Sequence, residues 1–526
     1  MKKFLLMLLA LVMIVSVFAA CGDGKGETTP KATTPKKEDD NKEEVKIPEN
    51  QKLNVDIDSI DYDGEIVRVV HWDTSEGNDF GIEEDQINND AVNDALYKRN
   101  LYTESDLGIE LEFCLEAGTA YNTISKFMTR LEAWESDPNT PVDIIAAQAR
   151  MLPHIMIEGY LIDLNLYTDS LDFDKAWWPA DCVELYEIKG DLYFITGDIS
   201  ANLLRNMTVI FTSKKILESR GFNYDEFMQK IKDKKWTLDE LIMMTEGIGA
   251  EGEGYDGNPN EAGPSKGDMF GMTTSWKHFD ALYMGCGFNY VTPSNKDTEV
   301  IKMAADMYSQ TVANWMTKVQ DWQKTGDFYC GPVGDGVYDY SFKNGFALFT
   351  LHRSFFGFDL QATDLDYAIV PTPMLDESQG EYFTAIGHGL ANFGICNFST
   401  DYDRAAQTMQ VLGYHAYSTT TPAVFEVSFK GKFSKDDYTI EMFDIIREAI
   451  TVDVGRIYDL LIAGGGSNDF WPNYPEYIVS FCISGGRDGW TTDKVWTTEF
   501  GTAKQITMKK LVDDANARLL AYIGAN

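Results

Sequence analysis

The chain has 526 residues, of which 44% are hydrophobic and 13% aromatic, enough for two or three domains with apolar cores. It carries 83 acidic against 45 basic residues, a formal net charge of −38 at pH 7. This balance argues against nucleic acid as a partner, because binding nucleic acid requires lysine and arginine to displace counterions. The acidity itself predicts solubility in water and nothing more specific.

The amino terminus has the pattern of a secretory signal. Lys2 and Lys3 precede an uncharged apolar run, residues 4–20, which ends in small residues. This run is short for a hydrocarbon core of about 30 Å. The tripeptide Ala-Ala-Cys that ends at Cys21 resembles the lipobox of bacterial lipoproteins, in which the cysteine is diacylated and becomes the first residue. We expect a signal peptide over residues 1–20 and a lipid on Cys21. An uncleaved anchor helix is the alternative, and either places the bulk of the chain outside the cytoplasmic membrane.

Residues 21–50 are predicted to form a disordered linker. They consist mainly of Thr, Pro, Lys, Glu and Asp, with almost nothing apolar. Such a segment cannot bury enough surface to offset the entropy lost on ordering. A lipid followed by a polar linker would hold a folded body near a membrane surface.

The first part of the body alternates strands and helices. "EIVRVVHWD" predicts a buried strand from about residue 65, and Asn89 or Asp90 is a suitable cap for the helix that follows. "IELEF" is a second strand and residues 119–136 a second amphipathic helix. "PVDIIAAQ" is apolar on both faces, as in a central strand of a parallel sheet. This order predicts a doubly wound α/β fold.

The alternation continues through the second part. "DLYFITGD" and "MTVIFTSK" predict strands, and "TLDE" from Thr237 is a capping box that opens a helix through Ile248. Residues 300–323 predict one long helix, "FALFTL" and "LDYAIVPTP" predict later strands, and the chain beyond Ala405 is largely helical.

Motifs for cofactors, metals and catalysis are weak or absent. "GEGYDG" follows a helix and opens none, so it lacks the geometry of a phosphate-binding loop. Asp256, Asn258 and Asn260 have the spacing of a calcium loop, but Glu261 and Gly267 stand where that loop needs Gly and Glu. We therefore expect no cofactor and no metal. Six further cysteines permit fifteen pairings, and their apolar surroundings favour buried free thiols: Cys114, Cys182, Cys286, Cys330, Cys396 and Cys482.

Aromatic and hydrogen-bonding residues follow several predicted strands. Ligands of doubly wound sheets bind beyond the carboxyl ends of strands. Aromatic rings beside polar groups suit sugars, since their C–H faces stack while their hydroxyls need partners. For each residue, packing in the core or a surface ion pair is the alternative. The candidate ligand-binding residues at these positions are Trp72, Asp73, Gln148, Arg150, Asp198, Trp276, His278, Tyr283 and Arg353.

An ordered set of segments carries a family resemblance. It includes "DAVNDALYKRNLYTESDLGIELE", "DIIAAQA", "WWPADCVELYEIKGDLYFITGDIS", "TVIFTSKKILESRG", "FKNGFALFTLHR", "LDYAIVPTP" and "MFDIIREAITVDVGRIYD". Together these cover most of residues 64–515 in the family's order. The chain resembles family 1 extracellular solute-binding proteins, the lipoprotein receptors of sugar-importing ABC transporters, which are similar in fold to maltose-binding proteins.

The resemblance implies a two-lobed, type II periplasmic-binding-protein-like α/β fold. Each lobe would be a mainly parallel sheet flanked by helices, with crossing hinge segments between them and ligand in the cleft. The implied boundaries are a first lobe at 51–200 with a return segment at 342–372, a second lobe at 201–341, and its continuation with C-terminal helices at 373–526.

The resemblance also implies roles for particular residues. Trp72–Ser75 match one sugar-contacting loop, Gln148 and Arg150 match another, and Trp276 matches an aromatic platform of the second lobe. "GGGSNDFWPNYPEY" departs from the family in detail, and its Trp471 and Tyr474 complete the expected ligand-binding set with Ser75.

The function expected from these observations is that of a receptor rather than an enzyme. A lipid-anchored monomer would capture an oligosaccharide at the extracellular face of the membrane and deliver it to ABC permease subunits. The alternatives are an extracellular carbohydrate-active enzyme that uses two cleft carboxylates, a surface adhesin, and a receptor for a non-sugar solute such as a peptide.

Overall fold

The computed structural model describes residues 48–73, 79–82, 90–116, 124–251, 268–305, 307, 309–332, 336–387, 389–430, 437–462 and 500–524. The chain divides into two units, residues 1–53 and 54–526. The described part of the first unit contains the short helix η1 (Glu49–Gln51). The other helices and strands of the described residues belong to the second unit.

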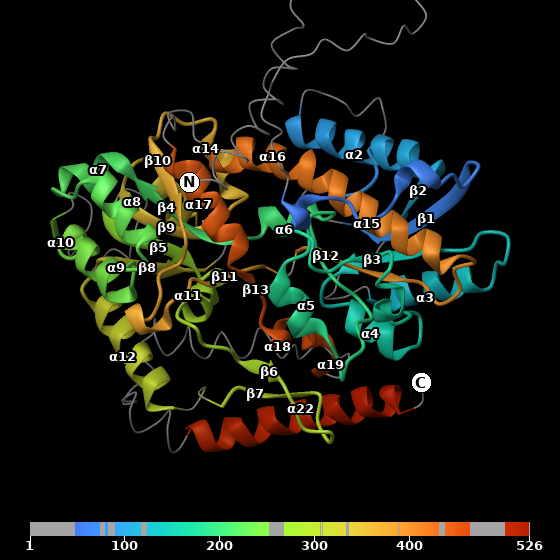
Figure 1. The fold of residues 1–526 in the computed structure, drawn as a ribbon. Helices are drawn as coiled ribbons and strands as arrows, with labels where there is room; N and C mark the ends of the chain where they lie inside the picture. Colours follow the sequence, from blue (N-terminus) through green and yellow to red (C-terminus); the bar gives the residue numbers. More distant parts are fainter. Residues whose placement is uncertain are drawn as a thin grey trace, which may run out of the picture. The chain divides into compact units, whose positions relative to one another are not determined.

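One four-stranded sheet in this unit has the order β12-β3-β1-β2. β1 is parallel to β2 and β3, and β12 is antiparallel to β3. The sheet and the helices that accompany it are named the first lobe (Figure 1). Its strands are β1 (Glu65–Trp72), β2 (Ile109–Glu116), β3 (Ile144–Gln148) and β12 (Ala391–Ile395). Its helices are α2 (Ala91–Leu107), α3 (Ile124–Glu135), α4 (Leu152–Ile157) and α15 (Tyr402–Ser418).

A five-stranded sheet has the order β10-β4-β9-β5-β8. β5 is parallel to β8 and β9, whereas β4 is antiparallel to β9 and β10. This sheet and its helices are named the second lobe. Its strands are β4 (Thr208–Ser213), β5 (Phe270–Ser275), β8 (Phe328–Gly331), β9 (Ala347–Arg353) and β10 (Tyr367–Val370). Its helices are α7 (Lys214–Ser219), α8 (Tyr224–Lys232), α9 (Leu238–Thr245), α10 (Ile248–Glu251), α12 (Gln310–Lys324), α13 (Val337–Lys343), α14 (Phe356–Leu360) and α17 (Tyr438–Glu448).

Shorter elements connect or cover the two sheets. Four of them are short strands that form two small sheets, in which β6 pairs with β7 and β11 pairs with β13. These elements are η2 (Ile57–Ser59), η4 (Leu164–Tyr167), α5 (Ala180–Tyr186), α6 (Ala201–Arg205), α11 (Asp280–Gly285), β6 (Val291–Pro293), β7 (Ile301–Met303), η5 (Glu377–Gln379), β11 (Thr384–Ala385), α16 (Thr420–Val424), the π-helix η6 (Phe425–Phe429), β13 (Ile450–Thr451), α18 (Val454–Ile457), α19 (Asp459–Ile462) and α22 (Phe500–Ile523).

Local sequence signals explain several helix starts. The Asp90 carboxylate accepts from the backbone N–H groups of Val92 and Asn93 at 2.9 and 3.1 Å, as an N-cap does. The Thr237 hydroxyl accepts from the backbone N–H of Glu240 at 3.4 Å, which confirms the predicted capping box. These two predicted starts are therefore confirmed, although α9 ends three residues before the expected position.

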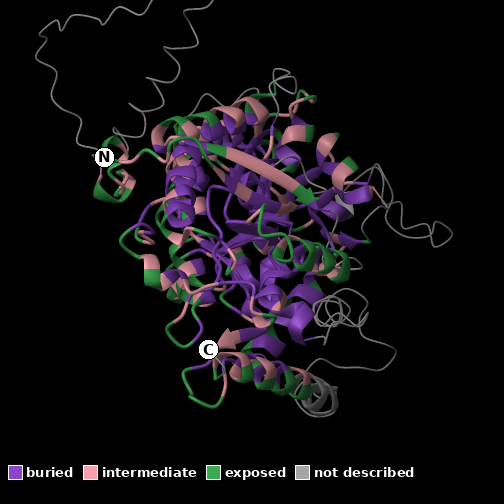
Figure 2. Cartoon of the chain, turned by 90° about the vertical axis from the view of Figure 1, so that its right-hand side faces the viewer, coloured by how far each residue is buried: buried purple, intermediate pink, exposed green. Residues whose placement is uncertain are grey.

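The cores of both lobes consist of strand residues and inward helix faces (Figure 2). All five residues of β3 are buried, in agreement with its prediction as a central strand. The five described cysteines that were predicted to be free thiols are free, and all but Cys114 are buried. Cys482 lies outside the described residues.

The expected return of residues 342–372 to the first lobe is wrong. β9 pairs with β4 and β5, and β10 pairs with β4, so both strands belong to the second sheet. The returning strand is β12, which pairs with β3 of the first sheet. Both β9 and β12 are apolar and largely buried, and such patterns do not specify which sheet a strand joins.

Two element predictions differ from the structure. The helix expected over residues 300–323 begins only at Gln310, because residues 301–303 pair with β6 and the Ser309 hydroxyl caps α12 by accepting from Val312 N–H at 3.3 Å. The strand expected over residues 191–198 is an irregular segment in which Ile195 makes a single bridge with Phe393.

Candidate functional site

Two connecting segments bring the carboxyl edges of the two sheets to a common region. Residues 199–207 start beside β12, where the Ala391 N–H donates to the Ser200 hydroxyl at 3.3 Å, and they lead directly into β4. Thr208 at the start of β4 pairs with Arg353 at the end of β9. The second segment, residues 386–390, leads into β12 and bridges Met207 through Ile386. Ligands of α/β proteins bind at such strand ends.

The first lobe contributes residues at the ends of β1 and β3. Trp72 is the last residue of β1 and 1% exposed, and its indole N–H has no hydrogen-bond partner among the described residues. Asp73 follows it and is exposed. Gln148 ends β3 beside Ala391 of β12 and is buried. An unpaired buried donor is costly, so the Trp72 indole is a candidate donor to a ligand.

Arg150 follows β3 and forms a fully buried ion pair with Asp459 at the start of α19. Both side chains are 0% exposed. A guanidinium taken from water requires such a partner, because burying a charge without one is far more expensive. Arg150 was predicted to belong to the site, but its carboxylate partner was not predicted.

The second lobe contributes residues at the end of β5. Trp276 follows Ser275 directly and is 45% exposed, although its large ring favours burial. Its backbone N–H donates to the carbonyl of Gly331, the last residue of β8, at 3.0 Å. An exposed indole fixed at a strand end is available for stacking on an apolar face of a ligand.

His278 lies in a cluster of rings beside Trp276. Its Nδ1 is 3.1 Å from the Ser275 hydroxyl, and its ring centroid is 4.3 Å from that of His352 on β9. Nε2 of His352 is 3.2 Å from the Asp339 carboxylate. Burial lowers the pKa of His278 well below its usual range, and electrostatic interaction with the neighbouring His352 and Arg353 lowers it further. His278 is therefore neutral at pH 7, a state in which it can both donate and accept hydrogen bonds.

Arg353 ends β9 next to both connecting segments. A Cβ atom added at Gly387 would lie 2.7 Å from Oδ1 of Asn206 and 3.0 Å from Nε of Arg353, so both side chains approach this glycine closely. Asn206 is fully buried, and its Nδ2 donates to the Asn202 carbonyl at 2.8 Å. Its Oδ1 has no hydrogen-bond partner among the described residues.

The turn formed by residues 453–459 contacts both lobes. Arg456 forms an ion pair with Asp280 of α11 and donates to the Ile386 carbonyl at 2.6 Å. The Asp453 carboxylate accepts from the backbone N–H groups of Tyr290 and Gly455 at 2.6 and 2.8 Å. Residues 453–459 were not predicted to belong to the site, although the acidic and basic residues of "DVGRIYD" were a usable signal.

Two predicted site residues do not join this group. Asp198 is 1% exposed and accepts from the Thr421 hydroxyl at 2.6 Å and from Arg447 at 2.7 and 2.8 Å. Burial raises its pKa, and Arg447 opposes this rise. Tyr283 is 0% exposed, with its ring 4.8 Å from that of Tyr290 and 5.4 Å from that of Trp315. In both cases the side chain is engaged inside the protein.

Phe355 is a further aromatic residue of the site that was not predicted from the sequence. It follows Arg353 by two residues and is 38% exposed. Its backbone N–H donates to the Arg205 carbonyl of the first connecting segment at 3.0 Å, and its ring stacks on Phe358 at 5.4 Å. The aromatic run "SFFGF" directly after a predicted strand was the signal that could have found it.

Several predictions lie outside the described residues. They are the lipidated Cys21, the ligand-binding residues Ser75, Trp471 and Tyr474, and the glycine-rich loop with its weak calcium spacing. Within the described ranges, no group of three or more His, Cys, Asp or Glu side chains is placed to hold a metal ion. None of the described helices combines the length and apolar character needed to cross a membrane.

A cavity of about 410 Å³ lies elsewhere, between β7 and α22. Its walls include Lys296 and Lys509, which pair with Glu299 at 2.6 Å and Asp513 at 2.7 Å. None of its lining residues lies at a carboxyl end of the two larger sheets, so it is not part of the candidate site.

No family model and no curated protein matches the sequence, but solved structures match the fold. The galacto-N-biose/lacto-N-biose I-binding protein of an ABC transporter from Bifidobacterium longum, in complex with lacto-N-biose, is 14% identical with a TM-score of 0.51. That match covers 88% of this chain and 98% of the other. The chain has the fold of the extracellular solute-binding proteins.

A second solved structure supports the same fold. The GacH receptor of Streptomyces glaucescens, solved unliganded and with acarbose, is 13% identical, with a TM-score of 0.50 over 87% of this chain and 99% of the receptor. The expected two-lobed α/β fold with helices flanking the sheets is thereby confirmed, although in the second sheet only β5 pairs in parallel, with β8 and β9. The family 1 resemblance holds at the level of this fold.

Proposed function

We propose that the chain is a solute-binding receptor that captures a carbohydrate between its two lobes and delivers it to an ABC permease. The observation that carries the proposal is the pair of exposed aromatic residues, Trp276 and Phe355, at the carboxyl ends of β5 and β9. They adjoin side chains that donate and accept hydrogen bonds, which is the combination that a sugar requires.

The two solved relatives support the ligand class. One was solved with lacto-N-biose and the other with acarbose. In the proposed mode, Trp276 and Phe355 of the second lobe stack on the ligand. Trp72 and Gln148 of the first lobe supply hydrogen bonds, whereas Arg150 is held in its buried ion pair with Asp459. Ligand would touch both lobes only when they are closed, so that binding shifts the population towards closure.

A receptor fits the described carboxylates better than a glycosidase. Hydrolysis of a glycosidic bond requires two carboxyl groups, one of them held protonated as a general acid. The buried carboxylates near the strand ends, Asp280 and Asp459, are each in an ion pair with an arginine. Burial raises the pKa of Asp453 to about 7, but its carboxylate accepts from three backbone N–H groups and is engaged inside the protein.

The proposal includes the setting of the receptor. A lipid on Cys21 and the polar linker after it would tether the folded lobes, as a monomer, at the extracellular face of the cytoplasmic membrane. Mass spectrometry of the protein from membranes tests this part, since a diacylated amino-terminal cysteine is expected. A mature protein that still begins at Met1 would contradict this part of the proposal.

A thermal-shift screen tests the ligand class. The purified protein would be heated in separate samples with monosaccharides, oligosaccharides, amino acids and peptides. We expect an oligosaccharide to raise the melting temperature in proportion to the logarithm of its concentration. Stabilisation by a peptide and by no sugar would contradict the proposed ligand class.

A further inference from the structure

The turn at residues 453–459 is attached to the second lobe at its beginning. The Asp453 carboxylate accepts from the backbone N–H groups of Tyr290 and Val291 at 2.6 and 3.3 Å. The Arg456 guanidinium pairs with Asp280, and the two side chains are 6% and 4% exposed. Asp280 adjoins Phe279, whose ring packs against Trp315 of α12, so this anchor belongs to the second lobe.

The same turn is attached to the first lobe at its end. Asp459 pairs with Arg150, which follows β3 of the first sheet, and α19 also contacts α4. Between Arg456 and Asp459 lie Ile457 and Tyr458, each 1% exposed. Two buried ion pairs, one to each lobe, are therefore separated by two buried residues.

This spacing limits how far the anchors can separate. Three residues of fully extended chain span at most about 10 Å. Arg150 and Asp280 consequently cannot move apart by more than a short distance while both ion pairs persist. A large opening of the lobes at this point requires one pair to break, and breaking a buried pair leaves an uncompensated charge.

We propose that the turn 453–459 is an ionic latch that holds the two lobes together in the ligand-free protein. The latch goes beyond the proposed function, because it acts without ligand. The latch sets the fraction of ligand-free receptor that is closed. Since the ligand binds to the closed form, the apparent affinity is proportional to this fraction.

The test is small-angle X-ray scattering of the ligand-free protein. Asp459→Asn removes the negative charge beside the Arg150 guanidinium. The free energy of the closed form is therefore raised, because the guanidinium can be hydrated only when the lobes open. We expect a larger radius of gyration for Asp459→Asn than for wild type, and the same direction of change for Asp280→Asn. An unchanged radius of gyration in both folded variants would overturn the latch.

A second variant separates opening from loss of folding. The double substitution Arg150→Met with Asp459→Leu replaces the buried pair by apolar residues, an exchange that is often neutral or stabilising. Because no charge is left to hydrate, we expect its radius of gyration to return to the wild-type value. If Asp459→Asn does not fold, the radius of gyration of Asp280→Asn is compared with that of the double variant. A radius of gyration larger than wild type in the double variant would contradict the role of the buried charges.

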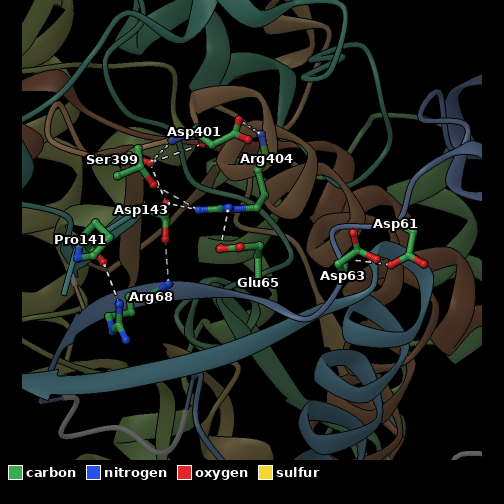
Figure 3. A network of polar contacts seen from close by, with 10 residues as sticks. Asp61, Asp63, Glu65, Arg68, Pro141, Asp143, Ser399, Asp401 and Arg404 are labelled. Carbon is green, nitrogen blue, oxygen red and sulfur yellow. Dashed lines mark hydrogen bonds and ion pairs between the residues drawn. The ribbon is translucent and has the colours of Figure 1, made fainter. Parts of the chain in front are cut away.

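A buried ion pair within one lobe provides the matched control. Asp143 precedes β3, is 0% exposed, and lies 3.4 Å from Arg404 of α15, also in the first lobe. Figure 3 shows it accepting from the Ser399 hydroxyl, at 2.6 Å, and from the Arg68 backbone N–H, at 3.0 Å. Asp143→Asn is expected to lower the melting temperature without changing the radius of gyration. An increase equal to that of Asp459→Asn would overturn the proposal, because opening would then follow from any lost buried charge.

Discussion

His278 and His352 place their imidazole rings 4.3 Å apart at the carboxyl ends of two parallel strands. Ser275 hydrogen-bonds one ring and Asp339 lies beside the other. Arg353, Lys277 and Arg456 add positive charge around His278. Protonation of His278 is unfavourable in these surroundings, because its ring is buried and positively charged groups lie beside it.

This pair predicts a pH dependence of stability. The pKa of His278 is below its ordinary value of 6.5, chiefly because the ring is buried. At pH values near and below 6.5 the His278 side chain binds more protons in the unfolded chain than in the native protein. The free energy of unfolding therefore decreases as the pH falls through this range. We expect the melting temperature of wild type to fall more than that of His278→Gln between pH 7.5 and 5.5. Equal falls, measured by calorimetry, would show that His278 does not contribute.

Trp276→Ala is expected to weaken binding of the cognate oligosaccharide at least tenfold, about 1.4 kcal/mol, because stacking on the indole is lost. The side chain is 45% exposed, so folding should be little affected. Titration calorimetry measures the affinity. The matched control is Leu166→Ala. Leu166 is an apolar residue with an exposed fraction of 74%, and it does not lie at a strand end of the candidate site. Unchanged affinity in Trp276→Ala would remove this residue from the site.

Phe355→Ala tests the aromatic residue that was identified only in three dimensions. We expect a loss of affinity of about tenfold, with a small effect on the melting temperature because the ring is 38% exposed. The conservative change Phe355→Tyr keeps the stacking face and should retain binding. A large loss of stability in Phe355→Ala, with wild-type affinity in the folded protein, would assign Phe355 to packing instead.

Asp198→Asn should affect stability rather than ligand affinity. Its carboxylate accepts from both Arg447 and Thr421, and removal of one partner of a buried ion pair costs about 3 kcal/mol or more. Denaturant unfolding is expected to show this loss. Titration of the folded variant should give wild-type affinity within about twofold, since no ligand contact is removed. A specific loss of affinity without loss of stability would return Asp198 to the ligand-binding set.

The sequence predicted local features of the fold well. The cap at Asp90, the capping box at Thr237 and the buried strand ending at Gln148 all depend on residues close together in the chain. Pairing between strands depends on distant segments, and β9 and β12 have equally apolar patterns. This is why the returning strand was assigned to residues 342–372 rather than to Ala391–Ile395.

The candidate site was predictable where a strand end was recognisable. Trp72, Gln148, Trp276 and Arg353 were all found by this rule, and the structure places them at the ends of four strands. The partner of Arg150 was not, because Asp459 lies more than 300 residues further along the chain and no local pattern links the two.

The most direct test of the account is calorimetric titration of the purified protein with oligosaccharides, followed by chromatographic recovery of the sugar. We predict that at least one oligosaccharide binds with one-to-one stoichiometry and is recovered chemically intact. Cleavage of the bound sugar, or binding of peptides with no response to any oligosaccharide, would contradict it.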